Sequence, residues 1–285
     1  MTAVSGPARF VDLHMHSTAS DGSRAPADVV RAASRAKLAA IALTDHDTVA
    51  GIGEAQHAGE ELGVRVVAGV ELSAVEGDTE THLLGLHLRD TGVLERALAG
   101  LREMRERRAR RIVERLDGIG VHISMESVLA QAADGAVGRP HVARALIAEG
   151  WAVDSRDAFD RYLAAGRPAY VPKEQLGMRD AIAMIHDAGG LAVLAHPAAS
   201  GTRDRLTVLR TQGLDGVEVR HPSHSSADTT RLAALARELD LVPSGGSDWH
   251  GAAEGPRTIG MMQVPPEWLT LQEERLVALG RAPAA

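Results

Sequence analysis

The chain has 285 residues, of which 45% are hydrophobic and only 2% aromatic, and it has no cysteine and a formal net charge of −7. This length suits one α/β barrel with an insert, whose core must be built from Ala, Val, Leu and Ile. The lack of cysteine excludes disulfides and thiolate ligands, so any metal must be held by nitrogen and oxygen. The negative charge argues against a general nucleic-acid binder but leaves room for a phosphate-bearing substrate.

Targeting signals are not evident in the sequence. No apolar run reaches the length of a membrane span, and residues 1–9 lack the apolar core of a signal peptide. We therefore expect a cytoplasmic protein with no membrane partner.

Apolar, β-branched runs alternate with helical patterns in much of the chain. The helical segments 26–37, 52–62 and 178–188 begin or end at proline or glycine and show apolar residues at helical spacing. This alternation predicts parallel strands in an α/β fold. The predicted strands are residues 10–16, 39–45, 64–70, 81–88, 191–196, 214–219 and 241–247.

The alternation stops between about residues 92 and 170, where the sequence is helical and charged. We expect a barrel formed by residues 1–91 and 171–285, with a helical insertion at 92–170 over the barrel mouth. The expected helices of the insertion are 101–116, 124–133, 141–149 and 157–164. Residues 266–285 are expected to form a terminal helix with an Ala/Pro tail.

Two histidines end the first predicted strand, in His14-Met15-His16, with Asp21 shortly after them. Strand side chains alternate with period two, so both imidazoles point the same way. Paired neutral imidazoles near a carboxylate form the start of a metal site. A single motif of this kind could also arise by chance from exposed histidines, and its recurrence at later strand ends is what favours a metal.

Similar groups follow at the ends of other predicted strands. They occur in Thr44-Asp45-His46-Asp47-Thr48, Gly69-Val70-Glu71, Thr81-His82, Ala195-His196-Pro197 and Ser247-Asp248-Trp249-His250. Only His82 lies at the start of its strand. Ligands from so many strands can converge only at one mouth of a barrel, where nine N/O groups suit two or three ions and Glu71 can bridge two. The predicted ligands are His14, His16, Asp21, His46, Glu71, His82, His196, Asp248 and His250.

These motifs together resemble those of the polymerase-and-histidinol-phosphatase (PHP) family of phosphoesterases, over nearly the whole chain. The resemblance implies a distorted, TIM-like (β/α)7 barrel with a trinuclear metal centre. It implies one ion held by His14, His16, Glu71 and Asp248, a second held by Glu71, His82 and His196, and a third held by Asp21, His46 and His250. Manganese is the first expectation for these two or three ions, with iron and zinc as alternatives.

Within the family, the chain resembles the group that contains a 3′,5′-nucleoside bisphosphate phosphatase and a 5′→3′ RNA exonuclease. The resemblance lies in the placement of the insertion and in residues 138–141, 166–171 and 223–225. We expect a phosphatase that converts a 3′,5′-bisphosphate to a 5′-monophosphate by attack of a metal-activated hydroxide. An exonuclease on short RNA, a histidinol phosphatase and a non-catalytic metal sensor are the alternatives, and no stable nucleic-acid complex is expected.

Positive side chains should hold the substrate's phosphate groups. The arginine-rich segment 102–115 is mostly expected to be a solvated helix face paired with glutamates, although Arg105 and Arg108 can share a face toward the mouth. Arg139 lies in a glycine-proline loop at a helix entry, where anions bind well. Further candidates are His141, Lys173 and His224, the last as a phosphate contact or proton donor.

Two further sets of residues have expected roles outside the ligand set. Asp45 and Asp47 are each expected either to orient an imidazole or to cap the next helix. The remaining histidines are expected to be surface or packing residues: His57, His87, His122, His186 and His221.

Overall fold

The computed structural model describes residues 10–77, 79–132, 137–172, 176–255 and 257–281. The chain forms two compact units, one made of Met1–Glu95 with Leu176–Ala285 and the other of Arg96–Gln175. Within the described residues, no helix is long and apolar enough to cross a membrane.

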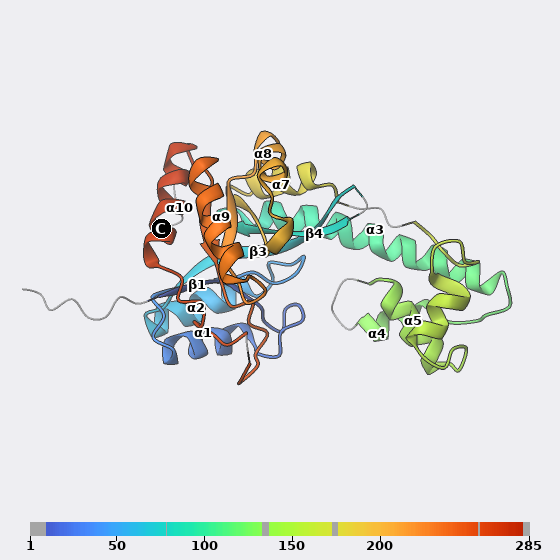
Figure 1. Cartoon of the computed structure of the whole chain (residues 1–285). Helices are drawn as coiled ribbons and strands as arrows, with labels where there is room; N and C mark the ends of the chain where they lie inside the picture. The colour runs from blue at the N-terminus through green and yellow to red at the C-terminus, as the bar shows by residue number, and fades with distance from the viewer. Residues whose placement is uncertain (1–9, 78, 133–136, 173–175, 256, 282–285) are drawn as a thin grey trace, which may run out of the picture. The chain divides into compact units, whose positions relative to one another are not determined.

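The first unit is built on one seven-stranded sheet, whose strands follow one another in chain order. Figure 1 labels β1, β3 and β4 of this sheet. The strands are β1 (Val11–Met15), β2 (Ala40–Leu43), β3 (Arg65–Glu76), β4 (Thr79–Leu86), β5 (Leu191–Leu194), β6 (Gly216–Arg220) and β7 (Val242–Gly245). The outer edges approach each other, because the Asp248 N–H donates to the His14 carbonyl and Met15 pairs with Trp249. The sheet is therefore a nearly closed, distorted TIM-like barrel.

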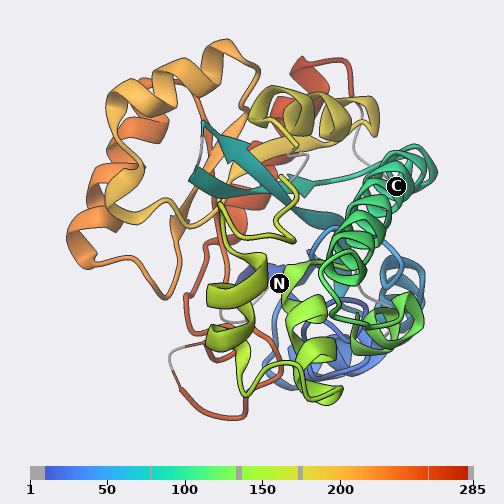
Figure 2. The same cartoon turned by 90° about the vertical axis from the view of Figure 1, so that its right-hand side faces the viewer.

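The expectation of parallel strands is wrong for β4. It pairs antiparallel with both β3 and β5, whereas the other neighbouring strands are parallel. No helix separates β3 from β4, so the two form a hairpin (Figure 2). The start of β4 therefore lies at the edge where the parallel strands end, with His82 opposite Ser73. This reversal explains why His82 was the one candidate ligand at the start of its strand.

Helices pack against this sheet. Four lie at positions predicted from the sequence: α1 (Pro26–Arg35), α2 (Ile52–Leu62), α7 (Met178–Asp187) and α10 (Pro266–Ala278). Two were not predicted, α8 (Arg203–Thr211) and α9 (Ser226–Glu238). The sequence feature that could have predicted them is the residue that caps each helix, because the Thr202 and Ser225 hydroxyls each accept a bond from the N–H three residues later.

Aliphatic side chains hold the strands in place. Leu13 and Ala42 share one buried cluster with Leu269 of α10, while Ile41 and Leu43 face Val29 of α1 in another. Burying such a side chain contributes about 1.5–3 kcal/mol, so the strand ends that carry polar groups rest on a rigid base.

The second unit is helical in its described part (green to yellow in Figure 1). It contains most of α3 (Thr91–Asp117), followed by α4 (Met125–Ala132), α5 (Arg139–Ala148), α6 (Ser155–Ala158) and one π-helical turn (Phe159–Leu163). It has its own hydrophobic core, formed around Leu116, Val128, Leu146 and Leu163. The first of these helices starts ten residues earlier than the expected segment 101–116, at Thr91.

Candidate metal centre

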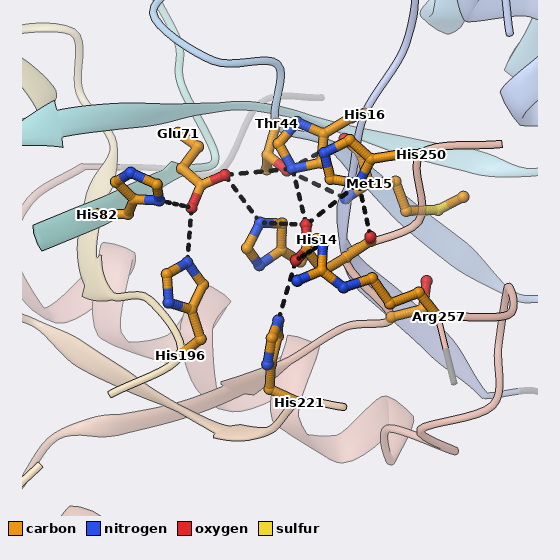
Figure 3. Close-up of polar contacts among 12 residues, drawn as sticks. His14, Met15, His16, Thr44, Glu71, His82, His196, His221, His250 and Arg257 are labelled. Atoms are coloured by element: carbon orange, nitrogen blue, oxygen red, sulfur yellow. Dashed lines mark hydrogen bonds and ion pairs between the residues drawn. The ribbon is translucent and has the colours of Figure 1, made fainter. Parts of the chain in front are cut away.

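The carboxylate of Glu71 lies at the middle of a histidine cluster (Figure 3). Its Oε2 atom is 3.1, 3.2 and 3.4 Å from the Nε2 atoms of His14, His16 and His46. Its Oε1 atom is 2.9 Å from Nδ1 of His82 and 3.0 Å from Nε2 of His196. Glu71 is buried, and its two oxygens face two separate groups of imidazoles, which is the arrangement of a bridging carboxylate.

The backbone brings these groups together. Glu71, in the middle of β3, pairs with His46 beyond the end of β2, through the bonds Asp47 N–H to Glu71 O and Glu71 N–H to Asp45 O. The antiparallel β4 then places His82 opposite Ser73, two residues beyond Glu71. Ligands widely separated in sequence thus meet because the strand ends share one edge of the barrel.

Asp248 completes a buried group with His14, His16 and Glu71. Its Oδ1 atom is 3.5 Å from His14 Nε2 and 3.2 Å from His16 Nε2. One potential ligand atom from each of these four residues lies within 4.8 Å of all the others. His16 is fully buried, yet neither of its ring nitrogens has a hydrogen-bond partner among the described residues. A buried imidazole without such a partner, surrounded by carboxylate oxygens, fits a metal ligand.

Asp21 defines a third group, on the more exposed side of His16. Its oxygens lie 3.2 Å from His250 Nε2, 3.7 Å from His16 Nδ1 and 3.9 Å from His46 Nε2. Burial opposes ionisation of Asp21, but the hydrogen bond from His250 and the charge of His46 outweigh it and lower its pKa to about 2. The structure therefore brings all nine predicted ligands together. Within the described residues, the side chains form four overlapping groups of possible donors, one of which consists of His14, Glu218 and His221.

The charges of the centre compensate one another. Burial disfavours the charged form of His14, but Glu71 and Glu218 outweigh it and raise the pKa of His14 well above its ordinary value. Burial likewise works against the ionised form of Glu71, and the neighbouring His14 and His16 still lower its pKa well below the usual range. Because the pKa of His14 is raised, binding of a metal at this ring must displace its proton.

Two residues that were not candidates from the sequence, Glu218 and Arg257, also belong to the centre. Glu218 is fully buried on β6, with Oε1 3.1 Å from His14 Nδ1 and Oε2 accepting the His196 N–H at 2.7 Å. Arg257 lies 2.8 Å from Asp248 Oδ2. An acidic residue inside an otherwise apolar buried strand was the available signal for Glu218.

The expectation for His221 is wrong. This residue is not a simple surface or packing histidine, because it is buried with Nε2 3.3 Å from Asp248 Oδ2 and its ring 5.0 Å from that of His196. Its signal was its place directly after β6, where the other strands also carry their polar groups.

The two aspartates beside His46 support the loops of the centre. Asp45 accepts bonds from the backbone and hydroxyl of Ser17 and from the Ser20 hydroxyl, each at 2.7 Å, and so holds the loop that carries Asp21. Asp45 therefore takes neither expected role, imidazole partner or helix cap. Asp47 accepts the Ser73 N–H at 3.0 Å and fixes β3 beyond Glu71.

His224 does not fit the expected role of proton donor. Its Nδ1 donates to the Val219 carbonyl at 3.0 Å, and its Nε2 accepts the Ala198 N–H at 3.1 Å. Burial lowers its pKa, which agrees with a neutral ring used on both sides by the backbone. His224 therefore serves to hold the loop after β5.

The remaining substrate candidates lie in the helical unit. Arg108 donates through Nε and Nη2 to the Val171 carbonyl, at 3.0 and 2.8 Å. Arg139 donates to the Leu163 carbonyl, and its guanidinium carbon is 5.6 Å from the ring centres of both Phe159 and Tyr170.

Two further candidates in this unit have clear positions. Arg105 is half-buried on α3. His141 accepts the Gly138 N–H at 2.8 Å, so it caps the start of α5. Lys173 lies outside the described residues.

A barrel with a cluster of His, Asp and Glu side chains near the ends of its strands is the architecture of a metal-dependent hydrolase. The PHP domain family matches residues 12–165, and the chain belongs to this family. It is 37% identical over 245 residues to a 5′-3′ exoribonuclease of Haemophilus influenzae, covering 84% of this chain and 89% of that protein. It is 36% identical over 265 residues to a 3′,5′-nucleoside bisphosphate phosphatase of Chromobacterium violaceum, covering 90% of this chain and 93% of that protein.

A solved structure agrees with this assignment. A Bifidobacterium adolescentis protein assigned as a metal-dependent phosphoesterase superimposes with a TM-score of 0.70 at 34% identity, over 94% of this chain and 97% of that one. The chain is therefore a metal-dependent phosphoesterase of the PHP family.

Proposed function

We propose that this phosphoesterase removes the 3′-phosphate of a 3′,5′-nucleoside bisphosphate and releases a nucleoside 5′-monophosphate. The observation that carries the proposal is the similarity to the bisphosphate phosphatase of C. violaceum, which extends over nine tenths of both proteins. The formal net charge of −7 also favours a small nucleotide over a long polyanion.

We assign the nine clustered side chains as ligands of two or three divalent ions, with Mn²⁺ first among the metals that N/O ligands suit. Glu71 would bridge two ions, because its oxygens face separate groups of histidines. Bound divalent ions lower the pKa of water and neutralise charge on the phosphate oxygens. The protein's own part is to orient the ligands, and Glu218 does this for His14 by accepting a hydrogen bond from Nδ1, which directs Nε2 toward the ion.

We assign the phosphate contacts to Arg139 and Arg108, with Arg105 on the same helix as Arg108. Burial and the nearby charge of Arg139 both lower the pKa of Arg108, so an anion between them would relieve repulsion that the folded chain maintains. The second supporting feature is the position of Arg139 at the first residue of α5, where backbone N–H groups favour an anion.

The test is phosphate release by the purified protein with Mn²⁺ and adenosine 3′,5′-bisphosphate. We expect inorganic phosphate and 5′-AMP, both abolished by a chelator and by Asp248→Asn. A short 5′-phosphorylated RNA and histidinol phosphate are run in parallel. Faster turnover of the RNA would replace our proposal with an exoribonuclease, and faster turnover of histidinol phosphate would replace it with a histidinol phosphatase.

The same experiment addresses a non-catalytic role. The protein is loaded with Mn²⁺ and its metal content is measured before the assay. Bound metal without turnover of any of the three substrates would overturn the phosphatase proposal in favour of a metal sensor.

A further inference from the structure

Arg205, on α8, makes a set of bonds that the ligand assignment does not use. Its Nε donates to Glu76 Oε2 at 2.8 Å, and its Nη2 donates to the Thr81 hydroxyl at 3.1 Å. Its Nη1 donates to the Ser200 hydroxyl at 2.7 Å. The side chain is 17% exposed, so all three nitrogens of the guanidinium are committed to the protein in a largely buried position.

These partners belong to the two segments that carry His82 and His196. Thr81 directly precedes His82 on β4, while Glu76 ends β3 in the same hairpin. Ser200 lies in the loop after β5, four residues beyond His196. The guanidinium therefore joins the tip of the hairpin to the loop after β5, and both histidines contact the same oxygen of Glu71.

Both segments extend beyond the regular strand pairing of the sheet. The hairpin tip continues past β2, which ends at Leu43 opposite Ala68 of β3, and its backbone is held by the bond from the Val75 N–H to the Leu176 carbonyl at 2.8 Å. The loop after β5 has left-handed backbone at two residues with side chains, His196 (φ 30°) and Ala198 (φ 42°). Such conformations persist only where surrounding contacts hold them.

A cavity of about 510 Å³ lies between these segments, and Arg205, His82 and His196 all line it. The backbone joins the two segments at their bases, where the Ala195 N–H donates to the His82 carbonyl at 3.1 Å, and Glu71 joins the two imidazoles. Arg205 adds side-chain bonds on the far side of the cavity. The planar guanidinium bridges it with three donors in fixed directions, which a lysine ammonium cannot reproduce.

We propose that Arg205 is a positioning residue that sets the spacing of His82 and His196 for the ion they share with Glu71. The inference rests on the proposed ligand assignment and concerns this one ion, not the substrate. A group that orients metal ligands without touching the metal affects metal affinity by about 10- to 100-fold when it is removed.

The test compares the full-length variant Arg205→Met with the parent protein by calorimetric titration with Mn²⁺ and by bound-metal content after gel filtration. We expect one ion to bind about tenfold or more weakly, so that the stoichiometry falls by one at limiting Mn²⁺. His82→Ala provides the reference pattern for loss of this ion. Arg205→Lys keeps a positive charge opposite Glu76 but loses the planar guanidinium with its three donors. We expect its affinity for this Mn²⁺ ion to lie between those of the parent and Arg205→Met.

Two controls separate positioning from general damage. Arg203→Met removes an arginine of the same helix that pairs with Glu238, away from the centre. Leu206→Ala opens a cavity under the fully buried face of α8 and lowers stability without touching the hairpin. Both should bind Mn²⁺ like the parent.

A readout without metal completes the design. In the metal-free protein, hydrogen exchange of amides at Glu76, Thr81 and Ser200 should be faster in Arg205→Met and unchanged in Arg203→Met. Parent-like Mn²⁺ binding by Arg205→Met, or uniform weakening of every ion as in a destabilised protein, would overturn the proposal. Neither result depends on which phosphoester is the substrate, so failure of the substrate assignment is recognised separately.

Discussion

Replacing Glu218 by glutamine should weaken metal binding although the replaced residue touches no proposed ion. The carboxylate is fully buried and accepts two hydrogen bonds, from His14 Nδ1 at 3.1 Å and from the His196 backbone N–H at 2.7 Å. Burial works against its charge, but His14 and His221 outweigh burial and lower the pKa of Glu218. The group is therefore an ionised acceptor that holds one tautomer of His14.

The magnitude follows from the two donors. A glutamine amide has one accepting oxygen and one donating nitrogen, so in either orientation its NH₂ meets a donor. A buried donor left without an acceptor costs about 1–3 kcal/mol. His14 can avoid this cost by moving its proton to Nε2, but that nitrogen is the one that faces Glu71. The cost therefore falls on metal affinity, and 1–3 kcal/mol corresponds to a loss of about 5- to 150-fold.

The assay is a calorimetric titration of Glu218→Gln with Mn²⁺, together with urea unfolding of the metal-free protein. Asp215→Asn is the matched control, because Asp215 also accepts bonds from a histidine and a backbone amide, His186 Nε2 at 2.7 Å and the Ala192 N–H at 2.8 Å. Asp215 directly precedes β6, the strand that carries Glu218, at the end away from the centre. The control should lose stability and keep its metal affinity. If Glu218→Gln binds Mn²⁺ within twofold of the parent, the reasoning about the His14 tautomer is refuted.

Three other changes have defined outcomes. Asp248→Asn should reduce bound metal and phosphate release together, and unchanged metal content by elemental analysis would contradict its assignment as a ligand. The raised pKa of His14 keeps a proton on the metal-free ring, so Mn²⁺ affinity should rise as the pH increases through that pKa. The stability that the protonated ring contributes to the metal-free protein is lost over the same pH range. A Mn²⁺ affinity that does not change with pH would contradict this linkage. In Gly246→Ala, the added methyl group would lie 2.4 Å from the backbone nitrogen and from Cβ of His14. We therefore expect the variant to be destabilised by about 1–3 kcal/mol and to bind metal more weakly. Unfolding in urea like that of the parent protein would contradict this expectation.

The sequence by itself predicted most of the fold and selected nine candidate ligands that the structure brings together. Seven apolar runs became the seven strands, because burial of aliphatic side chains is a local property that periodicity records. The nine candidate ligands stood next to those runs, and parallel strands that end at one edge must bring such groups together. His14, His16 and Glu71 could therefore be selected before any contact was known.

Only the tertiary structure decided how the centre is organised. The reversed direction of β4 depends on a hairpin and on pairing with β5, which local pattern does not specify. Glu218 and His221 act through partners 204 and 27 residues away along the chain, so their role could not be read from spacing. The division of Glu71 between two groups of imidazoles likewise arises from strands that meet in space, because distance across a barrel is set by packing and not by sequence separation.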